Sequence, residues 1–215
     1  MEVFGGNWVG YWEKIKADWS GRVRDDDIVL ISGDISWALT LDGALDDLAE
    51  IDSLNGKKFL IEGNHDYWWS SYKKVRETNF QSLTFIQYNA FKVGDYIICG
   101  TRGWTVPEKN AEQSGRDAKI FKREINRLEL SLKEAKRLQA ASEEIIVMMH
   151  FPPFNARFEK SEFTDLIAAH GIKTVVYGHL HGGANRYKEI VNMGQTNYYL
   201  TSCDFLNNKL FQLNQ

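Results

Sequence analysis

Four short apolar segments constrain the fold of this chain most, because each leads directly into side chains that can bind a metal ion. The pairs are residues 28–31 with Gly33-Asp34, 58–61 with Gly63-Asn64-His65-Asp66, 145–149 with His150, and 174–177 with Gly178-His179-Leu180-His181. In open α/β sheets, ligands bind beyond the carboxyl ends of the strands. We therefore expect these side chains to converge on one edge of a sheet.

The segments between these strands have the apolar spacing of amphipathic helices. We predict helices over residues 1–19, 41–54, 70–78 (capped by Ser70), 116–140 and 161–169, and a loop over 101–115. We predict strands over 27–31, 57–61, 144–149 and 173–177, a hairpin over 83–100 turning at Gly94-Asp95, and a β-rich tail over 186–213. Strands that alternate with helices indicate an α/β protein with mixed sheets. With three Pro and no Ser/Gly-rich tract, residues 1–215 are expected to form a single domain.

Composition excludes several classes of protein. The net charge is −3, from 26 basic and 29 acidic residues, which disfavours a nucleic-acid-binding protein. The longest apolar runs are far shorter than the roughly 20 residues needed to cross a bilayer, and the first residues do not resemble a signal peptide. Two Cys do not make a disulfide framework. A cytoplasmic protein without a membrane partner is the expectation.

The polar residues at the strand ends suit a divalent metal ion. Asp, Asn and several His together are the ligand set of borderline ions such as Mn²⁺, Fe²⁺ or Zn²⁺. Taken alone, Gly33-Asp34 is a turn, and His150 is more typical of a structural histidine. Four such signals, each after its own apolar strand, favour a metal site. His170 is different, because it lies at a helix end where an imidazole interacts with the helix dipole.

In this order, the motifs resemble those of the calcineurin-like metallophosphoesterases. Gly-Asp, Gly-Asn-His-Asp, a His after a strand, and Gly-His-x-His all match between Gly33 and His181. The resemblance implies a four-layer αββα sandwich of two mixed sheets flanked by helices, with a dinuclear metal site at the strand ends. It also implies a phosphohydrolase acting on a small phosphoester, as a phosphodiesterase or small-molecule phosphatase. The implied cofactors are two divalent ions, Mn²⁺ first and Fe or Zn as alternatives.

The resemblance also implies a role for each matched residue. Asp34 would bridge both metals, and a bridging hydroxide would be the nucleophile. Three residues would complete the second metal, namely Asn64, His150 and His179, while His181 would bind the first. His65 would contact the phosphate and assist the leaving group, with Asp66 supporting it from nearby.

Two departures from the family pattern matter. No Asp-x-His triplet precedes Gly33. We therefore expect the fold to lack its first strand and the following loop, about 20 residues together, and the first metal to lack half its protein ligands. A late start codon, a truncated gene or a shortened chain would each explain this. The rival hypothesis is therefore a metal-binding protein of the same fold with little or no catalytic activity. The longer signature of protein Ser/Thr phosphatases after Gly-Asp is also absent, which favours a smaller substrate.

Two further residues are candidates for substrate binding. Trp68, within Tyr67-Trp68-Trp69, would offer a stacking wall for an aromatic leaving group, although a place in the core explains it equally well. Arg102 would clamp a phosphate, and a surface ion pair is the alternative. The helix over 116–137 carries basic and acidic side chains opposite an apolar stripe, which is typical of a solvated face.

Overall fold

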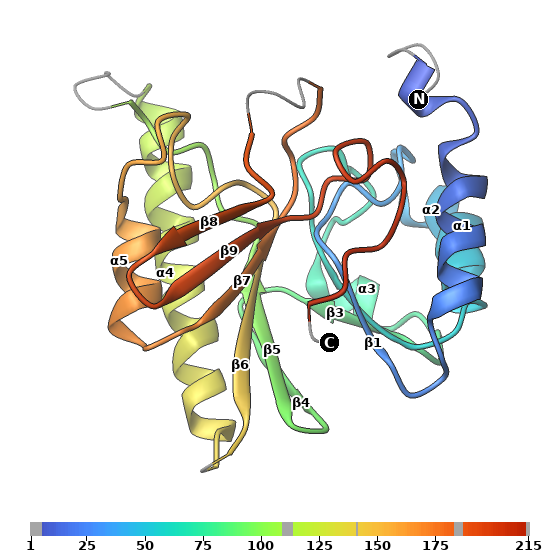
Figure 1. The fold of residues 1–215 in the computed structure, drawn as a ribbon, viewed down its shortest axis with the longest axis horizontal. Helices are drawn as coiled ribbons and strands as arrows, with labels where there is room; N and C mark the ends of the chain where they lie inside the picture. The colour runs from blue at the N-terminus through green and yellow to red at the C-terminus, as the bar shows by residue number, and fades with distance from the viewer. Residues whose placement is uncertain (1–5, 109–113, 141, 183–186, 214–215) are drawn as a thin grey trace.

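The computed structural model describes residues 6–108, 114–140, 142–182 and 187–213. Within these ranges, the strands form two sheets that lie between two sets of helices (Figure 1). The smaller sheet, sheet A, has the order β1-β2-β3, with all neighbours parallel. Its strands are β1 (Ile28–Ile31), β2 (Lys57–Ile61) and β3 (Leu83–Ile86).

The larger sheet, sheet B, has the order β4-β5-β6-β7-β9-β8 in the described residues. Its two outer pairs, β4 with β5 and β8 with β9, are antiparallel hairpins, and the inner pairs are parallel. The strands are β4 (Ala90–Val93), β5 (Tyr96–Thr101), β6 (Glu144–Met149), β7 (Thr174–Tyr177), β8 (Ile190–Met193) and β9 (Thr196–Leu200). Sheet B is therefore mixed, as predicted.

The helices lie on the outer sides of the sheets (Figure 1). On the side of sheet A are η2 (Gly6–Trp8), α1 (Tyr11–Arg22), α2 (Leu41–Asp52) and α3 (Tyr72–Arg76). On the side of sheet B are α4 (Gly115–Leu138) and α5 (Glu162–Ala169). The first long helix begins at Tyr11 after Gly10 in the left-handed conformation, and Ser71 rather than Ser70 caps α3.

Separate apolar layers hold this arrangement together. Phe59, Ile61, Ile146 and Val176 belong to a cluster between the two sheets. Leu128 and Leu132 of α4 belong to a second cluster with the outward side chains of sheet B. Two smaller clusters join sheet A to α1, α2 and α3. Burial of both faces explains why the strands are continuous apolar runs rather than alternating ones.

Two sequence predictions need correction. Residues 83–100 are not one hairpin, because β3 pairs in parallel with β2 in sheet A, and only β4 and β5 form the hairpin at Gly94. The chain crosses between the sheets at Tyr88, whose φ is +60°. For the same reason sheet A is wholly parallel and not mixed. Such pairings depend on contacts between distant segments, which local patterns do not specify.

Among the described residues, no helix combines the length and apolarity that a membrane crossing requires.

Candidate metal centre

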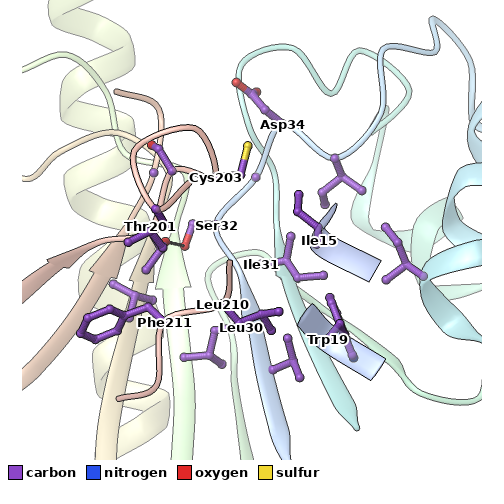
Figure 2. A pocket seen from close by; sticks show the side chains of 18 of the residues that line it. Ile15, Trp19, Leu30, Ile31, Ser32, Asp34, Thr201, Cys203, Leu210 and Phe211 are labelled. Atoms are coloured by element: carbon purple, nitrogen blue, oxygen red, sulfur yellow. Dashed lines mark hydrogen bonds between the residues drawn. The ribbon is translucent and has the colours of Figure 1, made fainter. Parts of the chain in front are cut away.

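The predicted ligands converge because strand ends of both sheets meet at one edge of the molecule. Asp34 follows β1 and Asn64 follows β2 in sheet A, whereas His150 follows β6 and His179 follows β7 in sheet B. The two sheets contact each other at this edge, where the Ser32 and Thr201 hydroxyl groups are 3.1 Å apart (Figure 2). Four residues far apart in the sequence thereby form one group.

The candidate ligand atoms are within a few ångströms of one another. Asn64 Oδ1 lies 2.7 Å from His150 Nε2 and 2.8 Å from His179 Nδ1. The two imidazole nitrogens are 3.2 Å apart, and Asp34 Oδ2 lies 3.5 Å from His150 Nε2. One ligand atom from each of Asp34, His150 and His179 falls within 4.8 Å of the others. This is the nitrogen and oxygen donor set that borderline divalent ions prefer.

The protonation states of the two imidazoles suit a metal ion. The Ser32 carbonyl lies 2.8 Å from His150 Nδ1, so Nδ1 carries the proton and Nε2 presents its lone pair to the group. Burial lowers the pKa of His150. Burial first, and the neighbouring His150 second, lower the pKa of His179 to about 4. Neutral imidazole nitrogens, an amide oxygen and a carboxylate thus face one another, and a divalent cation between them could accept a lone pair from each.

The close approach of the ligands depends on glycines and on unusual backbone conformations at the strand ends. At Gly33, whose φ is +90°, an added Cβ would lie 2.7 Å from His150 Nδ1. At Gly63, an added Cβ would collide with Asp34 Oδ1. Asp34 and His179 themselves have φ values of +56° and +69°. Non-glycine residues adopt this region at an energetic cost, and such residues cluster at functional sites.

The structure places Asp66 against backbone amides. Its carboxylate accepts hydrogen bonds from five donors, which are the amides of Asp34, Ile35, Ser36 and Gly63 and the Trp68 indole N–H. These bonds join the loop after β1 to the loop after β2, and each loop carries a candidate ligand. Burial raises the pKa of this carboxyl although the amide hydrogen bonds oppose the shift. In this structure Asp66 organises the ligand loops.

His65 lies at the rim of the site between two exposed aromatic rings. Its backbone N–H donates to Asp34 Oδ1 at 2.9 Å. The Trp37 ring stacks on the imidazole with centroids 4.7 Å apart, and Tyr67 approaches its edge at 6.3 Å. His65 Nδ1 is buried and has no hydrogen-bond partner among the described residues. Trp37 is 48% exposed and Tyr67 58%, so both rings are open to a ligand.

His181 lies apart from the closely packed ligands. Its Nδ1 is 2.8 Å from Asp204 Oδ1, and its ring contacts Trp8 at a centroid distance of 5.3 Å. Asp204 also accepts the amide hydrogen of Gly182 at 2.8 Å. Although burial raises the pKa of Asp204, the hydrogen bond with His181 makes the net shift downward. Asp204 therefore orients His181.

The two candidate substrate-binding residues are placed differently. Trp68 is completely buried, so it is a core residue and offers no surface to a substrate here. Arg102 donates to Glu62 at 3.0 Å in a mostly buried ion pair, and its guanidinium lies over the Trp104 ring. The backbone carbonyl of Arg102 accepts the amide hydrogens of His150 and Phe151. Arg102 thus lies behind the site.

Sequence reasoning missed Trp37 and Asp204. Asp204 comes shortly after β9, so the rule that selected the other strand ends would also have selected this carboxylate. Trp37 lies in the loop after Asp34 and had no local signal, because its stacking partner is distant in sequence.

Two sheets flanked by helices, with a carboxylate, an amide and imidazoles gathered at the strand ends, define an α/β protein with a candidate metal site. The chain belongs to the calcineurin-like phosphoesterase family, whose model matches residues 7–183. No curated protein matches the sequence. A crystal structure of a protein of unknown function, AQ665 from Aquifex aeolicus, is similar in fold at 12% identity and a TM-score of 0.47. The match covers 93% of this chain and 80% of that one.

Proposed function

We propose that this protein is a metal-dependent phosphohydrolase that cleaves a small phosphoester, either a phosphodiester or a small-molecule phosphate ester. The observation that carries the proposal is the approach of Asp34, Asn64, His150 and His179 within a member of the phosphoesterase family. These residues would hold one divalent ion, and Asp34 with His181 would contribute to a second. When bound, such ions neutralise charge on the phosphorus centre and activate water.

The protein's own residues would then bind and protonate the substrate. In this proposal His65 contacts the phosphate and donates a proton to the leaving oxygen, because it lies at the open rim beside the ligand group. Asp66 acts as a positioning residue through the backbone amides that it accepts. The exposed rings of Trp37 and Tyr67 flank His65, so a flat leaving group would have apolar surface to contact.

Hydrolysis of an aryl phosphodiester in the presence of Mn²⁺ tests this proposal. We expect His150→Ala to lower turnover at least about a hundredfold, because it removes one ligand and its contribution to charge stabilisation. The matched control is His170→Ala, since His170 caps the C-terminal end of α5 and its ring Nδ1 lies 2.9 Å from the Leu166 carbonyl of the same helix. Equal activities of the two variants would contradict the site assignment.

A second candidate function is metal binding with little or no catalysis by the same fold. The observation that favours it is the position of His181, which pairs with Asp204 and lies outside the close group of Asp34, His150 and His179. Under this alternative, one ion binds tightly and hydrolysis stays at background. Measuring bound metal and turnover on the same sample separates the two functions.

A further inference from the structure

Glu62 and Arg102 occupy equivalent places in the two sheets. Glu62 comes directly after β2 of sheet A, and Arg102 comes directly after β5 of sheet B. Arg102 Nη1 donates to Glu62 Oε1 at 3.0 Å, and the two side chains are only 17% and 16% exposed. A directional contact between the sheets therefore lies at the edge where the candidate ligands converge.

The backbone of Arg102 holds the segment that carries His150. Its carbonyl accepts the amide hydrogens of His150 at 3.1 Å and of Phe151 at 2.9 Å. On the side of sheet A, Glu62 is two residues before Asn64, whose Oδ1 lies 2.7 Å from His150 Nε2. A shift of Arg102 relative to Glu62 would therefore change the distance between two candidate ligands from different sheets.

A row of packed rings connects the same arginine to His179. The Arg102 guanidinium lies 5.3 Å from the centroid of the Trp104 ring. Trp104 packs against Phe151 with centroids 5.2 Å apart, and Phe151 packs against His179 with centroids 4.2 Å apart. Packing of this kind fixes the rotamer of a ligand side chain. Arg102 thus acts, directly or through one or two neighbours, on three of the four closely spaced ligands.

The ion pair is a poor source of stability, which favours a role in geometry. Removing two charges from water has a cost that their attraction often fails to offset, so apolar or neutral replacements of both partners are often as stable. The Nε–H group of Arg102 is also buried without a hydrogen-bond partner among the described residues. A directional but costly contact is better explained by the arrangement that it imposes on its surroundings.

We propose that Arg102 and Glu62 are positioning residues that hold the ligands of sheet A and sheet B at the separation that a divalent cation needs. The two side chains bind neither the ion nor the substrate, and they act through Asn64, His150 and His179. This inference rests on the metal-binding part of the proposed function and is independent of hydrolysis.

The test is the affinity of the full chain for Mn²⁺, measured by calorimetric titration after treatment with a chelator, together with the melting temperature. The decisive variant, Glu62→Gln/Arg102→Met, removes both charges at once and leaves neither unpaired. We expect it to melt within about 4 °C of the parent. We expect it to bind Mn²⁺ at least about tenfold more weakly, as is typical when a residue that orients metal ligands is lost.

Two further variants separate positioning from a general effect of charge. Arg102→Lys keeps a cation opposite Glu62 and should retain most of the affinity for Mn²⁺. The matched control is Lys16→Met/Glu50→Gln, which removes an ion pair of 2.7 Å that joins α1 to α2 on the outer side of sheet A. This control should bind Mn²⁺ as tightly as the parent.

Parent-like affinity in the decisive variant, or an equal loss in the control, would overturn the proposal. A large decrease in the melting temperature of the decisive variant would also overturn it, because the pair would then serve stability. Weaker Mn²⁺ binding in that variant, with no turnover by the parent, would contradict the proposed hydrolysis and still support the positioning role. A parent chain that binds no Mn²⁺ would overturn both.

Discussion

Replacing Asp66 with Asn should destabilise the protein strongly, although the two side chains have nearly the same shape. Of the five donors to this carboxylate, three reach Oδ1 and two reach Oδ2. In whichever orientation Asn is placed, its NH₂ group replaces an oxygen that accepts at least two N–H groups. Each buried donor left without an acceptor costs about 1–3 kcal/mol, so the expected loss is about 2–6 kcal/mol.

Urea and thermal unfolding of parent and variant measure this loss. For a chain of this length, about 1 kcal/mol lowers the melting temperature by roughly 2–4 °C, so we expect a decrease of about 5–20 °C. The control is Asp26→Asn, because the Asp26 side chain is fully exposed and forms a surface ion pair with Lys57 at 3.7 Å. Its effect should lie within about 0.5 kcal/mol. An Asp66→Asn variant as stable as the parent would refute the role of this carboxylate in joining the two loops.

Three further predictions concern the metal centre. Asp34→Ala and His179→Ala should lose both the bound metal and the hydrolytic activity. Asn64→Ala should lose less of each, because a water molecule can replace the amide oxygen. Metal analysis and turnover of an aryl phosphodiester by each variant check these expectations. His65→Ala should keep its bound metal while turnover falls roughly 10²–10⁴-fold. The decrease should be smaller for a substrate with an activated leaving group, which needs less protonation. Loss of metal from this variant would instead identify His65 as a ligand. Dialysis followed by metal analysis should leave about one tightly held ion per chain, since the proposal assigns the second position two protein ligands, Asp34 and His181, and the first position four. Two equally tight ions would contradict this ligand assignment.

The candidate site was largely predictable because its signals are local. Each ligand follows an apolar run, and a glycine precedes Asp34, Asn64 and His179. The clash that a Cβ would cause at Gly33 and Gly63 shows why glycine is needed there. The convergence of the four strand ends then follows from the general geometry of parallel strands.

The remaining features depend on contacts between distant segments. Trp68 belongs to the core and not to a substrate-binding wall because its ring packs in one cluster with residues such as Val75 and Phe85. The residues next to Trp68 in the sequence do not indicate these contacts. The pairing of β3 with β2, instead of β4, is likewise a choice between two partners with similar apolar patterns. Arg102 is a third case, because its guanidinium pairs with the Glu62 carboxylate, 40 residues away in the sequence, and not with a ligand at the rim of the site. Nothing in the sequence near Arg102 identifies this partner.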